Sequence, residues 1–112
     1  MKTITEQIRD HLLHPMSFEE LQKSEWSSLF EQLMRNRLIM GAYRYGRMQS
    51  AGKPQYDRVR AIREHLHGYA ETGNLEHLVD VANLALVEFV EGDHPQRNFH
   101  SVDDGAHAQK KT

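Results

Sequence analysis

The fold is decided by residues 75–91, which read LEHLVDVANLALVEFVE. Apolar side chains recur there every three or four positions, which is the spacing of one face of an α-helix. Asn74 can cap the start of this helix, and Gly92 ends it. The segment is therefore predicted to be an amphipathic helix with a wide apolar face formed by Leu75, Leu78, Val79, Ala82, Ala85, Leu86 and Phe89.

The same spacing predicts further helices upstream. One runs from Tyr56 to about Glu71 and stops at Thr72-Gly73-Asn74, where a glycine suits a left-handed C-terminal position. A longer helix begins near Ser24 or Glu25 and reaches about Tyr45.

Two shorter helical segments precede these. The first spans Ile4 to His14 and stops before Pro15. The second is capped by Ser17, with Glu20 completing a capping box. No strand alternation is present, so the chain is predicted to be all-α, a compact four-helix bundle-like domain over residues 1–92.

Residues 93–112 are predicted to form a polar C-terminal segment, either partly packed through Phe99 and Val102 or disordered. With 112 residues the chain has room for one core. Its hydrophobic fraction of 38% is modest, so covering a helix face with a second subunit would add stability. We therefore expect a homo-oligomer.

Composition excludes several classes of protein. The chain has no cysteine, which rules out a disulfide scaffold, a zinc–thiolate site and a cysteine nucleophile. Its formal net charge of -2 gives no strong nucleic-acid signal. The N-terminus lacks the apolar run of a signal peptide, and no stretch is long and apolar enough to span a membrane. These features predict a cytoplasmic protein that is not embedded in a membrane.

The helix at 75–91 carries a strip of oxygen ligands. Glu76, Asp80 and Asn83 are spaced so that they project from one side of it. Carboxylates one turn apart can hold Mg²⁺, which prefers oxygen ligands and keeps several waters. Glu76 and Asp80 are therefore candidate metal ligands, with Mg²⁺ as the candidate cofactor. The alternative is a solvated helix face with an acid near the helix N-terminus.

The run Glu76-His-Leu-Val-Asp80-Val-Ala-Asn83 resembles the second metal-binding helix of the MazG-like all-α nucleoside triphosphate pyrophosphohydrolases. The resemblance implies a four-helix, commonly dimeric domain that holds Mg²⁺ against a triphosphate, with Glu76 and Asp80 as ligands. His77 stands where that family has a second acid. The family also carries a Glu-x-x-Glu pair on the preceding core helix, and neither of the two long helices predicted before residue 75 has such a pair in this sequence.

A second candidate site is basic and aromatic. Arg37 and Arg44 share the helix face that bears Leu33 and Met40, and an arginine on an apolar face needs a partner for its guanidinium. Arg37 could pair with an internal carboxylate such as Asp80, could bind a phosphate or nucleotide, or could reach solvent at the edge of the stripe. The full set of candidate phosphate-binding or ligand-binding residues is Arg37, Arg44, Tyr45, Lys53, Tyr56 and Arg58.

Two functions are consistent with these patterns. The first is a MazG-like nucleotide-binding helical protein, which could act as a Mg²⁺-dependent nucleoside triphosphate pyrophosphohydrolase. The second is a non-enzymatic helical accessory protein, of the mobile-element type, that binds a protein partner or a nucleotide through its Arg/Tyr surface. In the second case the acids of residues 75–91 would be solvated or paired with arginine.

Overall fold

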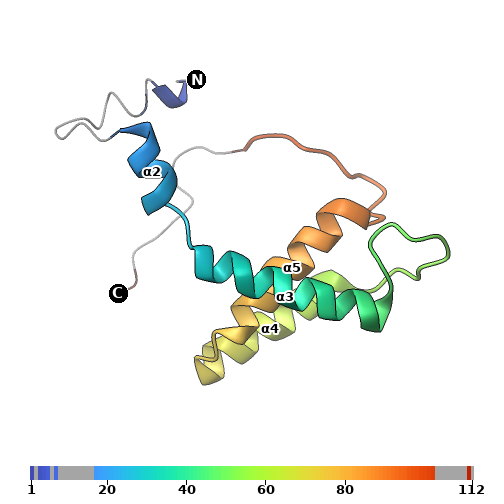
Figure 1. Cartoon of the computed structure of the whole chain (residues 1–112). Coiled ribbons are helices and arrows are strands. Elements are labelled where there is room, and N and C mark those ends of the chain that lie inside the picture. The colour runs from blue at the N-terminus through green and yellow to red at the C-terminus, as the bar shows by residue number, and fades with distance from the viewer. Residues whose placement is uncertain (2, 6, 8–16, 103–110, 112) are drawn as a thin grey trace.

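The computed structural model describes residues 1, 3–5, 7, 17–102 and 111. Within them the prediction of an all-α fold is confirmed, because the described residues form helices and loops and no strand (Figure 1). The helix predicted at 4–14 lies largely outside the described residues. The other elements are α2 (Phe18–Ser24), α3 (Ser28–Tyr45), α4 (Arg58–Thr72) and α5 (Glu76–Glu91).

The start of α3 differs from the prediction of Ser24 or Glu25. The helix begins at Ser28, and the Ser27 hydroxyl caps it by accepting a hydrogen bond from the Phe30 amide at 3.0 Å. Ser24 instead ends α2, whose predicted capping box between Ser17 and Glu20 is present. A chain with several serines in this region offers several caps, and Ser27 is the one that α3 uses.

The α4–α5 hairpin follows the predicted turn chemistry. α4 begins at Arg58 rather than Tyr56, because the Asp57 carboxylate accepts from the Arg60 amide and so caps the helix. At its other end Gly73 adopts the left-handed conformation, with φ of 70°. The cap position of α5 is Leu75, which makes no side-chain cap hydrogen bond, rather than the predicted Asn74; the Asn74 side chain instead accepts from the Glu76 amide at 3.0 Å, just before the helix.

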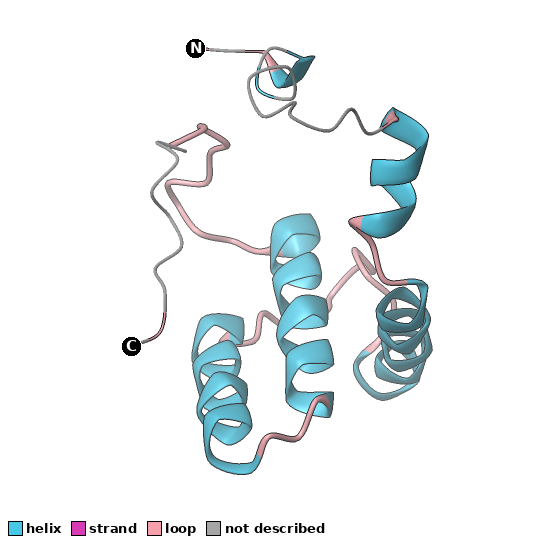
Figure 2. Cartoon of the chain, turned by 90° about the vertical axis from the view of Figure 1, so that its left-hand side faces the viewer, coloured by secondary structure: helices cyan, strands magenta, loops and turns pink. Residues whose placement is uncertain are grey.

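Helix α5 is the centre of the packing. It lies alongside α4, and α3 crosses it on another side, as Figure 2 shows with α3 viewed end-on. Helices α3 and α4 contact α5 but not each other, and α2 stands apart from all three (Figure 1). The basic residues of α3 and those near the start of α4 therefore both lie on helices that pack against α5, which carries the acidic residues.

The buried core is small. Among the described residues, Val79 at 4% exposure is the apolar side chain classed as buried, while many large apolar side chains of α3 face outward. No described helix is long and apolar enough to cross a bilayer. Much of the apolar surface that the periodicity assigns to a core therefore lies on the outside of this chain.

Candidate functional site

Arg37 links the middle of α3 to the first two turns of α5. Its Nε donates to Asp80 Oδ1 at 2.7 Å, and a second guanidinium nitrogen lies 3.4 Å from Asp80 Oδ2. A third nitrogen lies 2.7 Å from Glu76 Oε1. Both predicted metal ligands therefore converge on a single cationic group. The internal pairing considered for Arg37 from the sequence is the one that forms.

The charges at this site reinforce each other. The hydrogen bond to Asp80, together with the negative charges of Asp80 and Glu76, raises the pKa of Arg37 above its usual value, although burial acts in the opposite direction. Asp80 is largely covered, whereas Glu76 is exposed. The Arg37 site therefore opens to solvent on the Glu76 side.

Two histidines extend this site toward α4. His65 Nδ1 in α4 lies 2.9 Å from His77 Nδ1 in α5, so one ring donates a proton and the other accepts it. His65 Nδ1 also lies 3.8 Å from Asp80 Oδ2. Gly68 makes room for this pair, because a Cβ at that position would lie 2.7 Å from His77 Nε2.

The sequence did not predict the histidine pair. His67, two residues after His65, points in a different direction and lies near Glu71 instead. The signal for His77 was available only in part: His65 and Gly68 are spaced to share one face of α4. Which residue of α5 meets that face depends on how the two helices are aligned.

Asn83 is the third member of the α5 strip and is buried, with 8% of its surface exposed. Its Nδ2 donates to the Met34 carbonyl of α3 at 3.0 Å. Its Oδ1 has no hydrogen-bond partner among the described residues. The strip predicted from Glu76, Asp80 and Asn83 therefore faces α3 along its whole length.

Lys53 and Arg58 belong to a different cluster, at the other end of α5. Lys53 Nζ lies 2.7 Å from Glu91 Oε1, and Arg58 reaches both Glu91 at 3.0 Å and Glu88 at 3.1 Å. The Gln49 backbone amide donates to the second Glu91 oxygen at 2.7 Å. An open pocket of about 210 Å³ lies beside this cluster. Lys53 and Arg58 therefore hold the loop before α4 against α5.

The ion pairs around Glu91 and the backbone amide fix its charge state. The hydrogen bond from the Gln49 amide, followed by those of Lys53 and the nearby charges of Lys53 and Arg58, lowers the pKa of Glu91 below its ordinary value, although burial opposes this. Glu91 is therefore a carboxylate at neutral pH.

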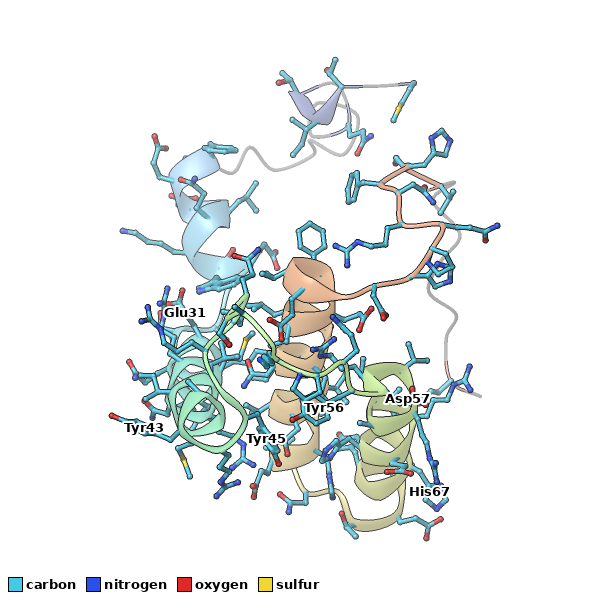
Figure 3. All side chains as sticks on the ribbon, turned by 90° about the vertical axis from the view of Figure 1, so that its right-hand side faces the viewer. Glu31, Tyr43, Tyr45, Tyr56, Asp57 and His67 are labelled. Carbon is cyan, nitrogen blue, oxygen red and sulfur yellow. The ribbon has the colours of Figure 1, made fainter. Side chains whose placement is uncertain are left out.

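The aromatic members of the predicted surface meet where α3 and α4 approach the same loop. Tyr45 and Tyr56 pack edge to face, with ring centroids 5.7 Å apart, as Figure 3 labels them. Arg44 is exposed beside Tyr45 and forms no ion pair within the described part of the chain. The predicted ligand-binding set therefore splits into Arg37 with its acids, the Lys53–Arg58 cluster, and an exposed surface of Arg44, Tyr45 and Tyr56.

The C-terminal segment is anchored at one residue. Arg97 donates to the Phe89 carbonyl at 2.6 Å and to the Glu88 carbonyl at 3.2 Å, both in the last turn of α5. Phe99 and Val102 are exposed, so they do not provide the packing that the sequence suggested. Residues 103–110 lie outside the described part of the chain.

The donor set for a metal is small. Within the described residues no group of three or more histidine, aspartate or glutamate side chains is arranged to hold a metal ion. Two converging carboxylates are nevertheless the protein share that Mg²⁺ needs when waters and substrate phosphates supply its other ligands. Glu76 and Asp80 are two such carboxylates, and in the structure both contact the Arg37 guanidinium.

Comparison of the chain with protein-family models, with curated proteins and with solved structures gives no match.

Proposed function

We propose that the chain is a MazG-like nucleotide-binding helical protein that takes a nucleoside phosphate together with Mg²⁺ at the α3–α5 edge. The observation that supports this is the convergence of Glu76 and Asp80 on one cation, with 2.7 Å contacts from each. Two neighbouring carboxylates also attract a divalent cation, which would take the place of the guanidinium between them. We place this function in the cytoplasm.

Each residue has a role in this proposal. Glu76 and Asp80 would hold Mg²⁺, which when bound supplies neutralisation of phosphate charge and activation of a water molecule. Arg37, released from part of its carboxylate pairing, would offer its N–H groups to a phosphate. Arg44 lies seven residues further along α3 on the same side and would add a second cation, with Tyr45 and Tyr56 beside it.

The resemblance to pyrophosphohydrolases adds a possible reaction, the release of pyrophosphate from a nucleoside triphosphate. The test is incubation with a panel of nucleoside triphosphates and Mg²⁺, with measurement of both nucleotide binding and pyrophosphate. We expect Mg²⁺-dependent binding that Asp80→Asn and Glu76→Gln each weaken by about tenfold, the equivalent of roughly 1.4 kcal/mol. Glu64→Gln, at an exposed acid of α4, is the matched control and should bind as the wild type does. Binding that is absent, or equal in all four proteins, would contradict the proposal.

A second candidate is the non-enzymatic interaction module. The observation that favours it is that Arg37 already satisfies both carboxylates, so that the acidic strip is neutralised within the chain. This candidate predicts no pyrophosphate release from any nucleotide. A nucleotide-induced rise in Tm that Arg44→Ala removes would assign nucleotide binding to the Arg/Tyr surface, whereas no rise with any nucleotide would leave a protein partner.

A further inference from the structure

All three guanidinium nitrogens of Arg37 are engaged with the two carboxylates that are proposed to hold Mg²⁺. Nε and one terminal nitrogen face the two oxygens of Asp80, at 2.7 Å and 3.4 Å. The other terminal nitrogen lies 2.7 Å from Glu76 Oε1. Arg37 therefore occupies the position between the carboxylates that a metal ion would need, and each of its nitrogens is already turned toward a carboxylate rather than toward a phosphate.

The charges of this site act against each ligand when it arrives alone. One guanidinium between two carboxylates leaves a net negative charge, which repels a phosphate. A metal ion is attracted by that charge, but it can reach the carboxylates only if Arg37 leaves them. Arg37 is half-buried, so its guanidinium would then lie without a partner at the α3–α5 interface. Each ligand alone therefore binds at a cost that the chain itself imposes.

Both costs disappear when the two ligands arrive together. We propose, on the basis of the function proposed above, that Arg37 exchanges partners: it pairs with Glu76 and Asp80 in the absence of ligands, and with a phosphate group when a divalent metal ion takes the carboxylates. A guanidinium can pair with a phosphate by the same two-point hydrogen bonding that it uses with a carboxylate. The metal ion and the nucleoside phosphate therefore bind cooperatively, and each raises the affinity of the site for the other.

The surroundings of the site allow this exchange without separation of the two helices. Glu76 is exposed and Asp80 is largely covered, so a ligand from solvent meets the Glu76 contact of Arg37 first. The hydrogen bond from Asn83 to the Met34 carbonyl, at 3.0 Å, does not involve Arg37 and continues to hold α3 on α5. Arg37 can therefore change its partner by a movement of its own side chain.

The first test measures the binding of Mn²⁺ alone, as a paramagnetic substitute for Mg²⁺, by electron paramagnetic resonance. Arg37→Gln removes the competing cation and should bind Mn²⁺ about tenfold more tightly than the wild type, the equivalent of roughly 1.4 kcal/mol. The matched control is Arg35→Gln, which removes the same charge from the same helix at a residue that pairs with Glu31 instead. This control should bind Mn²⁺ as the wild type does.

The outcomes of this titration separate the exchange from the proposed function. Mn²⁺ binding that is equal in the wild type and Arg37→Gln, or that Arg35→Gln strengthens as much, would overturn the exchange and leave the metal site in place. Absence of Mn²⁺ binding from all three proteins would overturn both the exchange and the metal site.

The second test asks whether a metal ion can replace the missing guanidinium. Arg37→Gln should be less stable than the wild type, because the largely covered Asp80 carboxylate loses its partner. Mg²⁺ should raise the Tm of Arg37→Gln by several degrees more than it raises that of the wild type, since a ligand that binds the folded state stabilises it. If the variant is unfolded at room temperature, Mg²⁺ should restore its helical circular dichroism. An equal rise in both proteins, or no recovery of an unfolded variant, would overturn the proposal.

The third test measures the cooperativity itself. The affinity for Mn²⁺ is determined with and without a saturating non-hydrolysable nucleoside triphosphate, for the wild type and for Arg37→Gln. The gain in affinity should be roughly tenfold larger in the wild type, because only there can a guanidinium pass from the carboxylates to the phosphate. The metal–nucleotide complex that forms in solution affects both proteins equally and cancels in this comparison. Equal gains would show that Arg37 only competes with the metal ion, and would overturn the exchange.

Discussion

Arg37 of α3 and Asp80 of α5 lie 43 residues apart in the sequence and form a two-point contact, with distances of 2.7 Å and 3.4 Å. Together with the Arg37–Glu76 ion pair and the Asn83 amide on the Met34 carbonyl, this contact supplies polar interactions between α3 and α5. The pair therefore has a structural role whatever ligand the site takes, and its removal should be measurable as a loss of stability.

Asp80→Asn should lower the free energy of unfolding by about 1–2 kcal/mol, because a charge-assisted hydrogen bond is lost at a partly buried site while Glu76 still neutralises Arg37. Urea denaturation followed by circular dichroism measures this change. The control is Glu64→Gln, which removes an exposed ion pair with Arg60 and should change stability by less than about 0.5 kcal/mol. Equal effects of the two substitutions would show that the Arg37 contact adds nothing.

Gly68→Ala should destabilise the protein, although alanine is normally the better helix former. The new Cβ would lie 2.7 Å from the His77 ring, so the ring must move and its contact with His65 is strained or broken. Gly41→Ala in α3 is the matched control, since its Cβ meets nothing within 4 Å.

Gly41→Ala should stabilise the protein by roughly 0.5–1 kcal/mol, because alanine lowers the conformational entropy of the unfolded chain and has the higher helix propensity. The comparison of the two thermal midpoints is the measurement. A Gly68→Ala protein with a Tm as high as that of Gly41→Ala would disprove the close approach of His77.

Asn83→Asp should be more damaging than Asn83→Leu, although aspartate has the same shape as asparagine. Aspartate loses the donor to the Met34 carbonyl and places a second acceptor or a charge beside it in a buried position. Leucine removes the polar group, including the Oδ1 that has no partner within the described residues.

We expect a loss of about 2–3 kcal/mol for Asn83→Asp at neutral pH and about 1 kcal/mol or less for Asn83→Leu. Chemical denaturation of both variants gives these values. If leucine proves the worse of the two, the hydrogen bond to α3 is not what places Asn83 at this position.

Acidification should reduce stability through Glu91. Its folded-state pKa lies below the ordinary value of 4.5, so its stabilising contribution is complete above pH 4.5 and disappears as the pH falls through the folded pKa. Thermal unfolding measured between about pH 6 and about pH 3 should show this as a steep fall in Tm at the acidic end. This range brackets the ordinary pKa values of carboxylates.

Glu91→Gln should be less stable at neutral pH and should show a shallower fall over the same range, because the group that titrates has been removed. Glu64→Gln, at an exposed acid, should retain the steep profile of the wild type. Parallel profiles for the wild type and Glu91→Gln would contradict the assignment of the pH effect to Glu91.

The sequence was sufficient for those features that depend on neighbours along the chain. The capping box of Ser17 and Glu20 and the left-handed Gly73 are local, and both are found where the residue pattern predicts them. Pairing with an internal carboxylate such as Asp80 was one of three alternatives that the sequence left open for Arg37, beside phosphate binding and exposure to solvent, and it is the one that forms. The cost of leaving a charge unpaired on an apolar face made this long-range contact a candidate but did not select it.

Other features depend on how helices are aligned and could not be predicted. The contact of His65 with His77 requires the relative position of α4 and α5, which periodicity alone does not supply. Lys53 and Arg58 looked free for a phosphate, but the loop before α4 folds so that both meet Glu91. The start of α3 could not be predicted because several serines in this region could have capped the helix.

The central position of α5 has a consequence for motion. Because α3 and α4 each rest on α5 and not on each other, α3 can detach while the α4–α5 hairpin stays closed. Amide hydrogens of α3 should therefore exchange with solvent through local opening, at a lower free energy than those at the centre of the hairpin. The helix that carries Arg37 is thus the part of the chain that is easiest to release and to dock again.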